Sequence, residues 1–109
     1  MTGEEIAAMA ESMGIPSSYY QFTSETAQPP PFLCYYLTDS DNFIADGVVY
    51  ARIETLVMEL YTAEKDFELE ARVEAALTAN DLAWQREEDY IGSERLWMIT
   101  YTTEVCINE

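Results

Sequence analysis

The chain has 109 residues, a length that fits one domain and can bury a core without a metal or disulfides. Hydrophobic residues make up 49%, so we expect the chain to fold. Its 21 acidic and 5 basic side chains give a net charge of −16, which repels DNA phosphates and anionic membranes and argues against a sequence-specific DNA reader. The chain has no histidine, the usual base beside a serine or cysteine nucleophile, which argues against an enzyme.

The N-terminal segment predicts a helix followed by a short strand. Thr2 and Glu5 have the spacing of a capping box, and Gly14 supplies the left-handed residue that ends a helix, so the helix is predicted over residues 2–13. Residues 17–23 are rich in tyrosine and phenylalanine, which favours a strand.

The middle of the chain predicts two strands joined by a connection. Residues 32–37 form the first strand and end at a run of short polar side chains over 38–42 that favours a turn. The second strand runs over residues 48–61, and its pattern changes register near Thr55, which predicts a bulge or a strong twist. We expect a long flexible loop over residues 39–47.

A second helix and two strands complete the pattern. Asp66 is placed to cap a helix with an apolar stripe, and strands are predicted over residues 83–89 and 94–107. The stripe consists of Leu69, Val73, Ala76 and Leu77. The order α-β-β-β-α-β-β predicts a single α+β domain over residues 1–109, with a mostly antiparallel sheet and two helices packed on one of its faces.

The sequence predicts no catalytic residue, cofactor or metal site. Cys34 and Cys106 lie in predicted strands without metal-type spacing, so we expect two buried, reduced thiols. The acidic run around Asp41 superficially resembles a calcium loop, but it lacks the glycine and closing glutamate of an EF-hand, and turn formation explains it better. No signal peptide or membrane span is expected, so the predicted origin is cytosolic.

The remaining features favour an interaction protein. Eight tyrosines and two tryptophans exceed what one thin core requires, and such residues are typical of subunit interfaces. The expected interface aromatics are Tyr35, Tyr50 and Trp97, and the expected partner or subunit loop contains Asp39, Asp41, Asn42, Phe43 and Asp46. The acidic charge is open to three interpretations, namely solubility, a channel past which DNA slides, or imitation of DNA.

Four stretches carry a resemblance to a known family. They are the string Asp-Asn-Phe-Ile-Ala-Asp at residues 41–46, Glu-Leu-Tyr-Thr at 59–62, Lys65-Asp66 before a glutamate-rich helix, and Tyr-Ile-Gly-Ser-Glu at 90–94 before a final strand containing tyrosine. With these strings, the chain resembles the small head–tail junction proteins of long-tailed bacteriophages and prophages, of the tail terminator or tail-completion type, over nearly its whole length.

The resemblance implies an α+β subunit that assembles with itself into a ring, commonly a hexamer. The ring caps the tail tube and meets the head-connector proteins, and DNA is only a passing cargo. It further implies a place in the bacterial host cytoplasm during assembly and in the virion tail, with no membrane partner and no catalytic residues. The alternative is an acidic DNA mimic that inhibits a DNA-binding enzyme.

Overall fold

The computed structural model of the chain describes residues 1–108 and contains two helices and six strands. In chain order they are α1 (Gly3–Glu11), β1 (Ser17–Tyr19), β2 (Phe32–Ser40), β3 (Phe43–Ala45), β4 (Val48–Thr62), α2 (Phe67–Ala79), β5 (Trp84–Ile91) and β6 (Leu96–Ile107).

The strands form one mostly antiparallel sheet in the order β1-β2-β4-β6-β5, and β3 pairs only with β4. The pairing of β1 with β2 is parallel, whereas every other pairing is antiparallel. The long strand β4 is the centre of the sheet, and its pairing with β6 runs from Arg52 opposite Ile107 to Thr62 opposite Trp97. The predicted α+β class is confirmed.

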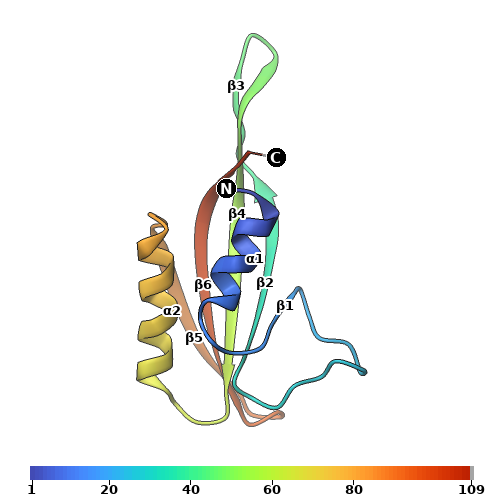
Figure 1. Cartoon of the computed structure of the whole chain (residues 1–109), viewed down its shortest axis with the longest axis vertical. Helices are drawn as coiled ribbons and strands as arrows, with labels where there is room; N and C mark the ends of the chain where they lie inside the picture. Colours follow the sequence, from blue (N-terminus) through green and yellow to red (C-terminus); the bar gives the residue numbers. More distant parts are fainter. Residues whose placement is uncertain (109) are drawn as a thin grey trace.

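Both helices lie on the same face of the sheet, as predicted (Figure 1). Side chains alternate along a strand, so every second residue of β6 points at the helices, beginning with half-buried Trp97 and continuing with buried side chains to Ile107. One core cluster joins the two layers. From the helical layer it includes Ile6, Met9 and Ala10 of α1, Met13 just after α1, and Leu69, Val73 and Leu77 of α2. From the sheet it includes Leu33, Leu56, Met58, Leu60, Ile99, Tyr101 and Val105.

The predicted starts of both helices are confirmed by their hydrogen bonds. The Glu5 amide donates to the Thr2 hydroxyl at 3.1 Å, and the Thr2 amide donates to the Glu5 carboxylate at the same distance. Helix α1 ends at Glu11 with Ser12 as its C-cap, earlier than the predicted end at Met13. Gly14 nevertheless has the predicted left-handed conformation, with a φ of 80°. At α2, the Leu69 amide donates to the Asp66 side chain at 3.0 Å. Local side-chain chemistry therefore determines where both helices begin.

The predicted flexible loop over residues 39–47 is wrong. Strand β2 continues to Ser40, and an additional strand, β3, pairs with β4 across a two-residue turn. The element order therefore contains one strand more than predicted. The predicted bulge is present, but its additional residue lies on β2, between Leu37 and Ser40, opposite Thr55.

The two cysteines differ, and the prediction for Cys106 is wrong. Cys34 is buried, whereas Cys106 is exposed, and both are free thiols. Cys106 points away from the helices because Val105 and Ile107, its neighbours in β6, point toward them.

The predicted strand over residues 17–23 is shorter than expected and ends at Tyr19.

Candidate functional site

A β-hairpin projects beyond the end of the sheet, and we call residues 42–53 the arm (Figure 1). Asp46 and Gly47 have φ values of 53° and 74°, the two successive positive values that a two-residue type I′ turn requires. At the base, the Asp41 amide donates to the Ile53 carbonyl at 2.8 Å, and the Ile53 amide donates to the Asn42 side-chain oxygen at 3.0 Å. The arm is therefore a hairpin with a defined turn and a hydrogen-bonded base.

The arm carries an unusual concentration of exposed apolar side chains. The exposed fractions are 60% for Phe43, 60% for Ile44, 55% for Val48, 51% for Val49 and 65% for Tyr50. Successive side chains along a strand point to opposite faces, so the neighbours Val48 and Val49 place members of this set on both faces of the arm. Apolar surface that the rest of the chain leaves uncovered on two faces is a feature of partner-binding segments.

The structure places the predicted loop residues on the arm and on the adjoining end of β2. Asp39 lies in the last part of β2, Asp41 and Asn42 lie at the base of the arm, Phe43 lies in β3 and Asp46 lies in the turn. Ile44, Val48 and Val49 are exposed residues of the arm that were not among the predicted site residues. The signal that identifies them is the Asp46-Gly47 pair between two apolar triplets, a strong hairpin pattern.

The three predicted interface aromatics do not form one surface. Tyr50 is exposed on the arm, where it is the additional residue of a bulge opposite Phe43 and Ile44. Tyr35 is only 9% exposed and packs in the core, so almost none of its side chain is available to an interface. Trp97 lies at the beginning of β6, the end of that strand that is remote from the arm. Its side chain is half-buried, and its ring centroid is 5.0 Å from that of Tyr90.

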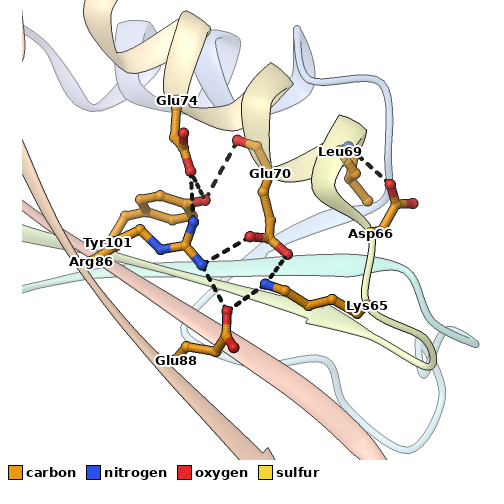
Figure 2. Close-up of polar contacts among 8 residues, drawn as sticks. All are labelled: Lys65, Asp66, Leu69, Glu70, Glu74, Arg86, Glu88 and Tyr101. Carbon is orange, nitrogen blue, oxygen red and sulfur yellow. Dashed lines mark hydrogen bonds and ion pairs between the residues drawn. The ribbon is translucent and has the colours of Figure 1, made fainter.

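A buried acid on α2 is the centre of a second polar site (Figure 2). Glu70 is 2% exposed, and its two carboxylate oxygens accept hydrogen bonds from the Lys65 ammonium at 2.6 Å and from the Arg86 guanidinium at 2.9 Å. Burial alone would lower the pKa values of Lys65 and Arg86, but Glu70 and the neighbouring acids raise both overall. Both cations therefore stay charged at neutral pH.

Three further residues extend this site toward the sheet (Figure 2). Arg86 also contacts Glu74 at 3.2 Å and Glu88 at 2.9 Å, and Glu88 accepts a second hydrogen bond from Lys65. The Tyr101 hydroxyl donates to Glu74 at 2.7 Å. The pKa of Tyr101 is raised, first by burial and second by the Glu74 carboxylate. These bonds join α2 to β5 and β6, so their role is to hold the helix on the sheet.

The second face of the sheet carries an open hollow of about 660 Å³ next to the segment after β1. In it, the Glu59 carboxylate accepts hydrogen bonds from Tyr36 at 3.0 Å and from Tyr61 at 2.9 Å. Burial and the charge of Glu59 raise the pKa of the Cys34 thiol, which keeps the sulfur protonated and a poor nucleophile. The thiol is therefore not activated.

Comparisons with known proteins add no relative, since no protein-family model and no curated protein matches the sequence significantly. Within residues 1–108, no group of three or more acidic or cysteine side chains could hold a metal ion. No helix in the described part of the chain is long and apolar enough to cross a membrane.

Proposed function

We propose that this protein is a self-assembling structural subunit of a phage or prophage tail, of the tail terminator or head–tail joining type. The observation that supports the proposal best is the arm, whose apolar side chains are exposed at the end of a well-packed domain. In this interpretation the arm contacts another subunit of the ring.

The arrangement of the cations also supports a structural role. Lys65 and Arg86 bind Glu70, Arg52 binds Glu54 at 3.1 Å, and Arg72 donates to the Met13 carbonyl at 3.0 Å. These four cations have partners within the chain. A ring of such acidic subunits would present a negative surface to DNA passing through it, without phosphate contacts that would retain the DNA.

Light scattering across protein concentration and salt tests self-assembly. Salt screens the repulsion between acidic subunits, so the proposal predicts a discrete larger mass, such as that of a hexamer, that increases with salt. Electron microscopy of the same sample should show closed rings. A monomer at millimolar concentration and high salt would contradict the proposal.

A double variant links assembly to the arm. Phe43→Ser with Tyr50→Ser removes apolar surface without changing charge, so we expect a lower mass with an unchanged urea midpoint. Phe67→Ser is the control, because Phe67 is 73% exposed but lies outside the arm on α2. Equal loss of assembly in the control would show that the arm has no special role.

An acidic DNA mimic is the alternative. The feature that favours it is the run of exposed acids Glu87, Glu88 and Asp89 on the edge strand β5. This function predicts a small oligomer or monomer that inhibits a DNA-binding enzyme in a salt-sensitive way, and it predicts no effect of the arm variants on that inhibition.

A further inference from the structure

We infer that the arm of one subunit binds the open edge of strand β2 on a second copy of this chain. The inference depends on the proposed self-assembly and names the two surfaces that meet. The receiving surface comprises residues 36–40 of β2 with Tyr19 and Tyr20, and we call it the β2 edge.

The β2 edge is an incomplete strand edge. Strand β1 pairs with β2 only from Ser17 opposite Leu33 to Tyr19 opposite Tyr35, whereas β2 continues to Ser40. Residues 36–40 therefore have β4 on one side and no described strand on the other. On that second side the Leu37 amide donates to the Tyr19 hydroxyl at 3.1 Å, a side-chain bond that a strand from another copy would replace. An open strand edge pairs readily with a strand of another chain.

Strand β3 of the arm supplies the complementary edge. It pairs with β4 on one side only, so its other side is open within the described chain. Adding β3 of one copy to the β2 edge of another would extend the sheet. The exposed Phe43 and Ile44 would then lie near the exposed rings of Tyr19 and Tyr20, which are 55% and 62% exposed.

The distribution of charge selects a second copy as the occupant. The β2 edge contains one acid, Asp39, and residues 14–38 contain one further charged residue, Glu25. The arm contains one acid and one base, Asp46 and Arg52. Nearly all the negative charge lies elsewhere in a chain of net charge −16. The arm and the β2 edge are therefore the surfaces through which two acidic copies can approach with the least repulsion.

The opposite edge of the sheet is unsuited to the same contact. Strand β5 forms that edge and carries Arg86, Glu87, Glu88 and Asp89 in succession. Charged side chains on an edge strand disfavour pairing with another chain. Contact between the arm and the β2 edge joins two different surfaces, so repetition of the contact closes into a ring when the rotation between copies allows it.

Cross-linking between variants that each carry one exposed cysteine tests the inference. Cys106→Ser removes the exposed thiol, and Cys34 is buried. In that background, an arm variant Ile44→Cys is mixed with an edge variant Thr38→Cys and treated with a short bis-maleimide. The control mixture pairs the same arm variant with Glu87→Cys on β5. All three positions are exposed, so reagent access is comparable.

Docking raises the local concentration of the paired thiols, so we expect about tenfold more heterodimer from the arm and β2-edge mixture than from the control. The difference should increase with salt. Equal yields from both mixtures, or a predominance of arm-to-arm dimers, would overturn the inference.

Light scattering of the unmodified protein separates the two proposals. An oligomer by mass without preferential arm-to-edge cross-linking rejects this interface but retains self-assembly. A strict monomer without cross-links at high salt rejects both.

Discussion

Arg86 on β5 donates a 2.9 Å hydrogen bond to Glu70 on α2, although Glu70 is only 2% exposed and lies 16 residues earlier in the chain. A buried carboxylate is tolerated because Lys65 occupies its other oxygen at 2.6 Å. This contact ties the helix to the edge strand of the sheet.

Loss of the Glu70 charge should destabilise the fold. We expect Glu70→Ala to lower the free energy of unfolding by about 2–4 kcal/mol, because it leaves the hydrogen-bonding groups of Lys65 and Arg86 partly buried without this acceptor. Urea denaturation measures the change. The control Glu68→Ala removes an exposed acid of the same helix and should change stability by less than about 1 kcal/mol. Equal effects would show that the buried ion pairs contribute nothing specific.

The packing of α2 on the sheet has its own test at Leu77, which is 0% exposed. We expect Leu77→Ala to cost about 3 kcal/mol through the cavity it leaves, and Leu77→Asp to unfold the domain because a charge cannot be buried there without a partner. Ala75→Asp introduces the same charge at an exposed position of α2 and should leave the domain folded. Circular dichroism distinguishes the variants, and a folded Leu77→Asp would contradict the helix-on-sheet packing.

The turn of the arm should depend on Gly47, whose φ of 74° favours glycine. We expect Gly47→Ala to destabilise the hairpin by about 1 kcal/mol, because a side chain is strained in the left-handed region. Amide hydrogen exchange should increase within the arm and stay unchanged in the core. Gly92 has no positive φ and open space around it, so Gly92→Ala should leave exchange in the arm unaltered. Unchanged exchange in Gly47→Ala would argue against this turn.

Stability should decrease at alkaline pH. Burial and then Glu59 raise the pKa values of Tyr36 and Tyr61, so the folded state holds these protons more tightly than the unfolded chain. Their contribution is complete below the ordinary tyrosine pKa of about 10 and is lost as the pH rises through the raised values of the folded state. The raised pKa of Lys65 acts in the same direction.

Urea midpoints between pH 9 and pH 12 measure this decrease. Glu59→Gln removes one cause of the raised tyrosine pKa values, so its midpoints should fall less steeply with pH. Glu87→Gln removes an exposed acid of β5 and should retain the slope of the unmodified protein. Identical slopes in all three proteins would show that Glu59 does not control the two tyrosines.

The sequence by itself determined the helices and most of the strands. Thr2, Glu5 and Asp66 cap helices through bonds to residues three positions away, and the apolar spacing of Leu69, Val73 and Leu77 gives α2 its buried face. Such forces act within a few residues, so they can be recognised along the chain. The turn at Asp46-Gly47 was equally local, and the pattern was present although the loop prediction overlooked it.

Only the tertiary structure decided what each face meets. Glu70 lies three and seven residues before Val73 and Leu77 on the same stripe, but its burial requires Arg86, which the pairing of β5 with β6 brings to it. The Asp46-Gly47 pair between two apolar triplets likewise marks Ile44 and Val49 as hairpin residues without showing that nothing in the described chain covers them. Burial depends on contacts between segments far apart in sequence, and strand order and register establish those contacts.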